Sequence, residues 1–174
     1  TKLRQKSQPC RLFETPQTVI RDLFLYLDDD GIHVEAAVDG PATQAKLAIP
    51  RLDLATTLTL TNGRAQTILQ AQPDLWSPEN PVLYDVTLSA GGDSVGDRVG
   101  FRRIERRGTR ILLNGQPVFL RGISVHEDDE LQGKLTSEAD IRRRFAHARE
   151  LGCNFLRLAH YPHHEMAARI ADEM

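Results

Sequence analysis

Short runs in which apolar and polar residues alternate dominate the first hundred residues of the chain. Thr57 and Thr59 flank Leu58, as expected for a strand that buries one face. Asn62-Gly63 supplies residues that tolerate the positive φ angles of a tight turn. The pattern predicts strands at residues 19–27, 32–38, 42–49, 55–60, 67–71, 83–89 and 94–103. Seven short strands with this spacing predict an all-β, immunoglobulin-like sandwich.

After Gly115 the pattern changes to short, almost wholly apolar runs separated by segments with helical spacing. One apolar strand begins at Val118, and a second covers residues 154–159. A polar loop of roughly a dozen residues follows the first strand, which is longer than most connections in compact domains. After the second strand, apolar positions recur at helical spacing from Met166 to Met174 and predict an amphipathic helix.

The segment between the two apolar strands predicts another helix. Ser137 is expected to cap its N-terminus, and Asp140 three residues later makes an imperfect capping box, where Glu or Gln is usual. Ile141 and Phe145 then recur at helical spacing. Gly152 is expected to end this helix in the left-handed conformation.

The order strand, helix, strand, helix is typical of parallel strands that are covered by helices. Two such units cannot close a sheet, so we expect more of a barrel to follow Met174. The predicted organisation is a sandwich at residues 1–106 and, at residues 107–174, the first two βα units of an incomplete (β/α)8 TIM barrel.

Composition narrows the possible partners. The formal net charge of the 174 residues is −2, and neither half of the chain is strongly charged, so nucleic acid is not expected as a partner. No apolar run approaches the roughly 20 residues needed to cross a bilayer. Cys10 and Cys153 fall in different predicted domains, so we interpret both as free thiols. The sequence indicates neither a compartment nor an oligomeric state.

Two polar stretches follow the apolar strands, at residues 124–130 and 157–164. Active sites of TIM barrels lie at the carboxyl ends of the strands. If the two strands are parallel neighbours, four side chains converge on one pocket: His126, Asp128, Arg157 and His160.

Five sequence blocks, in order, resemble glycoside hydrolase family 2, whose members include β-galactosidases, β-glucuronidases and β-mannosidases. The blocks are LWSPENPVLY at 75–84, VGFR at 99–102, LNGQP at 113–117, FLRGISVHED at 119–128 and NFLRLAHYP at 154–162. Residues before Leu75 match the family only in their strand rhythm. The resemblance implies an immunoglobulin-like domain that leads into a catalytic barrel.

The resemblance also implies a retaining β-glycosidase that uses two glutamates about 5 to 5.5 Å apart. In the family both glutamates lie on later barrel strands, so no catalytic residue is expected in this chain, and neither Glu127 nor Glu130 is assigned such a role. A carbohydrate substrate and the remainder of the barrel are the implied partners, with no metal and no other cofactor. As the sugar that is cleaved, a β-galactoside ranks ahead of a β-glucuronide and a β-mannoside.

The resemblance further assigns roles to the four converging residues. His126 and His160 would contact sugar hydroxyls in the −1 subsite, Arg157 would brace the catalytic carboxylates, and Asp128 would touch the glycone. The family carries Ser or Thr before its His-Tyr-Pro triplet, and this chain has Ala159 there, which makes the surroundings less polar.

Simpler interpretations compete for the same residues. The two histidines could serve only local hydrogen bonds, Arg157 could pair with an acid for structural reasons, and Asp128 lies in an acidic run typical of a solvated face. Histidines 160, 163 and 164 with Asp128 could hold zinc. However, His163 and His164 are adjacent at the expected start of the last helix, so their side chains would project about 100° apart and could not easily both bind one ion. Trp76 could stack on sugar, but we favour a core or interdomain position.

A run of arginines offers one more alternative. Arginines 102, 103, 106, 107 and 110 could form a nucleic-acid patch, but no aromatic residues are interleaved to stack on bases, so we interpret them as a solvated strand and turn.

Three hypotheses for function stand. The chain could be a piece of a family 2 glycosidase that is inactive as an isolated chain, a non-catalytic sandwich module for carbohydrate or protein binding, or a metal-dependent hydrolase.

Overall fold

The computed structural model describes residues 16–128, 133 and 137–174, so Cys10 and Glu130 lie outside the described residues. The chain divides into two compact units, Phe13–Pro117 and a second unit that contains Val118–Met174. We describe each unit by itself.

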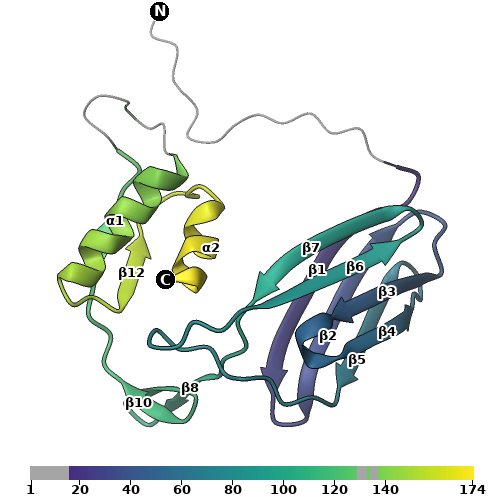
Figure 1. The fold of residues 1–174 in the computed structure, drawn as a ribbon, viewed down its shortest axis with the longest axis horizontal. Coiled ribbons are helices and arrows are strands. Elements are labelled where there is room, and N and C mark those ends of the chain that lie inside the picture. Colours follow the sequence, from purple (N-terminus) through teal and green to yellow (C-terminus); the bar gives the residue numbers. More distant parts are fainter. Residues whose placement is uncertain (1–15, 129–132, 134–136) are drawn as a thin grey trace, which may run out of the picture. The chain divides into compact units, whose positions relative to one another are not determined.

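Two antiparallel sheets form most of the first unit (Figure 1). One sheet has the order β1-β2-β5, with β1 at Val19–Asp28, β2 at Gly31–Asp39 and β5 at Arg64–Leu69. The other has the order β4-β3-β6-β7, with β4 at Leu54–Thr59, β3 at Gln44–Ile49, β6 at Tyr84–Ala90 and β7 at Asp93–Val99. A 3-10 turn, η1 at Pro50–Leu52, links β3 to β4. The predicted sandwich of seven strands is confirmed.

Alternation along these strands places the core between the two sheets. The burial pattern of β6 alternates between buried and exposed at every residue, as the sequence pattern predicts. Its inward side chains include Tyr84, Val86 and Leu88, all at most 2% exposed. Ile32 of β2 and Ile49 of β3 are also fully buried in this core.

A small three-stranded sheet of order β10-β9-β8 follows the sandwich. Its strands are β8 at Ile104–Arg107, β9 at Arg110–Leu113 and β10 at Gln116–Val118. Asn114 and Gly115, both at positive φ, form the turn between β9 and β10. The sequence pattern did not predict this sheet, and it corrects one boundary: Val118 ends β10 and does not begin a barrel strand.

The second unit contains two βα units in the predicted order. They comprise β11 at Gly122–Val125, α1 at Glu138–Glu150, β12 at Phe155–Leu158 and α2 at Met166–Glu173. The strands β11 and β12 are paired in parallel, with Gly122 opposite Phe155 and Val125 opposite Leu158. This arrangement is consistent with the start of a TIM barrel.

The helix termini follow the predicted chemistry. The Ser137 hydroxyl accepts a hydrogen bond from the Asp140 backbone N–H, while the Asp140 carboxylate accepts from the Ser137 N–H, so the capping box is complete. The Ser137 hydroxyl also donates to the Asp140 carboxylate at 2.6 Å. This bond, the bond from the Ser137 N–H and the Arg143 guanidinium lower the pKa of Asp140 to about 2. Gly152 follows the C-cap Leu151 at φ 75°, as expected for the residue that ends a helix.

Candidate functional site

The candidate site lies at the carboxyl ends of β11 and β12. Because Val125 pairs with Leu158, the residues that follow each strand emerge at the same edge of the sheet. The Ala159 backbone N–H donates to the Val125 carbonyl at 3.2 Å, which extends the ladder by one residue. Residues 126–128 and 159–164 are therefore held side by side.

The structure brings the four predicted site residues together. The rings of His126 and His160 lie edge to face with centroids 5.6 Å apart. The Arg157 Nη2 donates to the His160 Nδ1 at 3.0 Å. The His126 Nδ1 and the Asp128 Oδ2 are 4.0 Å apart, with both side chains about half exposed. The four polar groups thus face solvent over a short stretch of surface, and their role in sugar binding stays a prediction.

The contact with Arg157 determines which ring nitrogen of His160 carries a proton. A guanidinium only donates hydrogen bonds, so Nδ1 of His160 must accept and its proton must sit on Nε2. His160 therefore offers Nε2–H as a donor. A hydroxyl group has lone pairs that can accept from such a donor.

Beneath this surface lies a residue whose burial the sequence analysis missed. Glu127 is only 2% exposed, although it belongs to the acidic run expected to form a solvated face. The exposure pattern alternates through Val125, His126, Glu127 and Asp128 as it does along a strand, so the two flanking site residues point outward and Glu127 points inward. If the period of two of the strand had been continued beyond Val125 in the sequence, it would have predicted that Glu127 points inward.

The histidines proposed as metal ligands have other partners. His163 lies against Glu127, and the His164 Nδ1 accepts from the Met166 backbone N–H at 3.2 Å. Among the described residues, no three His, Cys, Asp or Glu side chains are grouped so that they could hold a metal ion. The donor set thus does not fit the metal-dependent alternative.

Trp76 is packed within the sandwich unit, as favoured from the sequence. Its ring lies against Gly100, where a Cβ atom would come within 2.7 Å of the indole, and the Arg102 guanidinium covers the ring at 4.8 Å from its centroid. Its backbone carbonyl accepts from the Asn114 side-chain amide at 2.9 Å. Trp76 therefore joins the sandwich to the turn after β9.

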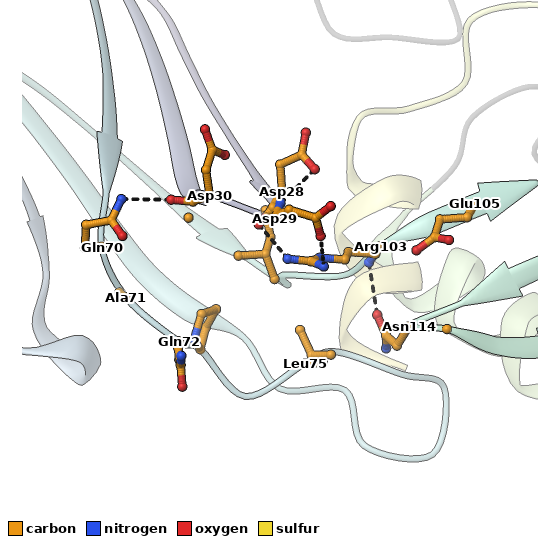
Figure 2. Close-up of a pocket in the computed structure, with 14 residues that line it drawn as sticks. Asp28, Asp29, Asp30, Gln70, Ala71, Gln72, Leu75, Arg103, Glu105 and Asn114 are labelled. Carbon is orange, nitrogen blue, oxygen red and sulfur yellow. Dashed lines mark hydrogen bonds and ion pairs between the residues drawn. The ribbon is translucent and has the colours of Figure 1, made fainter.

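A groove of about 790 Å³ opens on the sandwich unit beside the turn at residues 28–30 (Figure 2). Arg103 lies in the middle of it and donates to the Asp29 carboxylate and to the Asp28 carbonyl, while its backbone N–H donates to the Asn114 side chain at 3.0 Å. The lining contains several carboxylates and no aromatic residue. The Arg103 guanidinium, which is the cation at the centre of the groove, thus already stabilises the turn at residues 28–30.

The arginine run has a similar structural explanation. Arg106, Arg107 and Arg110 are exposed on β8 and β9, as predicted for a solvated strand and turn. Arg102 and Arg103 make the contacts with Trp76 and Asp29 described above.

Two other expectations concern the chain as a whole. Cys153 is a half-buried free thiol. No helix in the described part of the chain is long and apolar enough to span a membrane.

The two units together, a β-sandwich followed by parallel βα units, are consistent with a sandwich domain that leads into a TIM barrel. Two family sequence models match the chain: "Glycosyl hydrolases family 2" over residues 19–102 and "Glycosyl hydrolases family 2, TIM barrel domain" over residues 104–174. The chain belongs to glycosyl hydrolase family 2.

Individual relatives agree with this assignment. The chain is 30% identical over 167 residues to a β-galactosidase of Arthrobacter sp. (strain B7), a match that covers 94% of this chain and 16% of that protein. A β-galactosidase of Pseudoalteromonas haloplanktis is 28% identical over 192 residues, with coverage of 94% and 18%. The chain thus spans less than a fifth of the length of these relatives.

Solved structures extend the comparison to other sugars. A GH2 β-galacturonidase from Eisenbergiella tayi, solved with bound galacturonate, matches with a TM-score of 0.75 and 26% identity over 92% of this chain and 32% of its own. The apo β-glucuronidase 3 of Bacteroides uniformis matches with a TM-score of 0.75 and 26% identity over 91% and 22%.

Proposed function

We propose that this chain is part of a retaining β-glycosidase and that its barrel unit supplies one wall of the −1 sugar subsite. The observation that carries the proposal is the convergence of His126, Arg157 and His160, with Asp128 beside them, at the carboxyl ends of two parallel strands. The acid/base and nucleophilic glutamates would come from barrel strands outside this chain.

The chemistry of the four residues suits a sugar ring better than a metal. His126 and His160 supply imidazole groups for hydroxyls, and Asp128 supplies an acceptor for the glycone. Arg157 fixes the tautomer of His160 and carries a charge that can brace a catalytic carboxylate in the complete barrel. Hydrogen bonds of this kind strengthen in the oxocarbenium-like transition state, where they accelerate the reaction.

A β-galactoside is the proposed substrate, because the curated relatives reported above are β-galactosidases. The solved relatives act on uronides, so a β-glucuronide is the main competitor. The full-length product of the reading frame that contains this chain should be assayed with aryl β-galactoside, β-glucuronide and β-mannoside. We expect the galactoside to be hydrolysed fastest and the isolated 174-residue chain to give no turnover above a buffer blank.

The assay also decides between the enzyme and its rival, a non-catalytic sandwich module for carbohydrate or protein binding. A full-length product without turnover on any of the three substrates would favour the module. Turnover by the isolated chain would show instead that its own carboxylates are catalytic.

A further inference from the structure

A buried cluster under the candidate site joins the two loops that carry its residues. The Glu127 backbone N–H donates to the Tyr161 hydroxyl at 2.8 Å. The Glu127 Oε1 accepts from the His164 backbone N–H at 2.6 Å and lies 3.7 Å from the His163 Nδ1. One residue at the end of β11 therefore holds three positions within the loop that follows β12.

His163 completes the cluster from inside the loop. Its ring stacks on Tyr161 with centroids 4.6 Å apart and planes only 6° from parallel. Its Nε2 lies 3.0 Å from the Ala159 carbonyl oxygen, and since a carbonyl only accepts, Nε2 carries a proton. The residues on both sides of His160 are thus fixed by the cluster.

The Glu127 carboxyl group and the His163 ring face each other in a buried position. The side chains of His163 and Glu127 are only 3% and 2% exposed. Because Nε2 faces the Ala159 carbonyl, Nδ1 is the ring nitrogen that faces the Glu127 carboxyl group, so the two buried side chains are in direct contact. The other oxygen, Oε2, is buried and has no hydrogen-bond partner among the described residues.

We propose that Glu127 is a positioning residue: its buried side chain ties residues 159–164 to the end of β11 and thereby keeps His160 facing His126. Glu127 points away from its neighbours His126 and Asp128, so it acts through them and does not touch the sugar. The proposal rests on the proposed function of these residues as a subsite wall.

Glu127→Gln and Glu127→Ala separate the parts of this role in the full-length protein. Glutamine keeps an oxygen that can accept from the His164 N–H but replaces the carboxyl group that faces His163 by an amide, whereas alanine removes both contacts. We expect kcat per folded molecule to fall about 10-fold for glutamine and about 100-fold for alanine, since small misplacements of groups at the reacting centre are this costly. KM should change less than about 3-fold, because interactions made only in the transition state act on kcat.

Glu150→Gln and Glu150→Ala, at the exposed last residue of α1, provide matched controls and should leave both constants unchanged. A purely structural role would lower the melting temperature or the yield of Glu127 variants while kcat per folded molecule stayed at the control value. That outcome would overturn the proposal.

Side-chain NMR of the histidines in the 174-residue chain gives a test that does not depend on activity. Glu127→Gln should shift the imidazole resonances of His163 and His160, and Glu150→Gln should shift neither. If the His163 and His160 resonances do not move, the proposed coupling is wrong. If the full-length protein hydrolyses none of the three substrates, the proposed function fails, while this NMR comparison still decides whether Glu127 holds the loop.

Discussion

The sandwich unit and the barrel unit bury their apolar residues very differently. In the sandwich, residues from both sheets form one core in which side chains such as Leu88 and Ile49 are fully inaccessible. In the barrel unit, the buried cluster consists of Ile141, Phe145, Ala167 and Ile170, all from the two helices. The sandwich therefore satisfies its hydrophobic pattern by itself, while the barrel unit satisfies only its helical part.

The two strands of the barrel unit leave apolar side chains exposed. Parallel strands in α/β proteins are usually buried on both faces. Here Ile123 of β11 and Phe155 and Leu158 of β12 are 38% to 47% exposed, despite an apolar sequence typical of buried strands. The apolar pattern correctly predicts parallel strands. The burial of these side chains, however, would require neighbours that the two strands do not provide for each other.

A pair of identical truncations gives the sharpest test of this contrast. Leu88→Ala should lower the free energy of unfolding of the sandwich by about 3 kcal/mol, because it leaves a cavity in a closed core. Leu151→Ala in the barrel unit should change stability by less than about 0.5 kcal/mol, because that side chain is 74% exposed.

The chain offers a separate probe for each unit in denaturant titrations. Trp76 is its only tryptophan and reports the sandwich by fluorescence, whereas both described α-helices lie in the barrel unit and report it by far-UV circular dichroism. A Leu88→Ala midpoint equal to that of the unchanged chain would show that the sandwich core is not closed.

The close approach of β11 and β12 predicts a somewhat smaller effect. A Cβ atom at Gly122 would collide with the backbone carbonyl of Phe155 on the paired strand. Gly122→Ala should therefore destabilise the barrel unit by about 2 kcal/mol, as overpacking does in other proteins. Gly96→Ala on β7, where the nearest atom is 3.7 Å away, is the matched control in the sandwich and should be close to neutral. Equal midpoints for the two variants by circular dichroism would contradict the pairing of Gly122 with Phe155.

The capping box of α1 predicts the smallest effect. Ser137→Ala should lower the stability of the barrel unit at neutral pH by about 1 kcal/mol, which is typical for the loss of an N-cap. Because the pKa of Asp140 is lowered from 3.8 to about 2, its contribution is present above about pH 4 and is lost as the pH falls toward 2.

Helical circular dichroism recorded between pH 5 and pH 2 checks this sign. Asp140→Asn should remove that part of the pH dependence, and Asp93→Asn, at the start of β7 in the sandwich, should leave it unchanged. A helix signal that became more stable on acidification would contradict the assignment.

Local chemistry explains why much of this architecture could be predicted from the sequence. Period-two alternation identified the sandwich strands, and Ser137 with Asp140 identified the start of α1, because both signals depend on near neighbours. The convergence of His126 and His160 followed once parallel pairing was assumed.

The errors arose where distant residues decide the outcome. Val118 to Leu120 reads as a buried strand, but Val118 belongs to β10 and Phe119 is 80% exposed. Glu127 reads as part of a solvated acidic run, but its partners His163 and His164 lie more than thirty residues away in the sequence. The composition of the local segment indicates neither result, although a period of two continued from Val125 would have placed Glu127 on the buried side.

The exposed apolar side chains of β11 and β12 also have a consequence for biosynthesis. Ribosomes add roughly 5–20 residues per second, and domains generally fold as units, N-terminal first. The sandwich strands are all complete by Val99, so this unit can close its core while Ile123 and Phe155 have yet to leave the ribosome. Once they emerge, the open edges of the two-stranded sheet present a template for unwanted pairing. The barrel unit is therefore where we expect a nascent chain of this protein to need a chaperone.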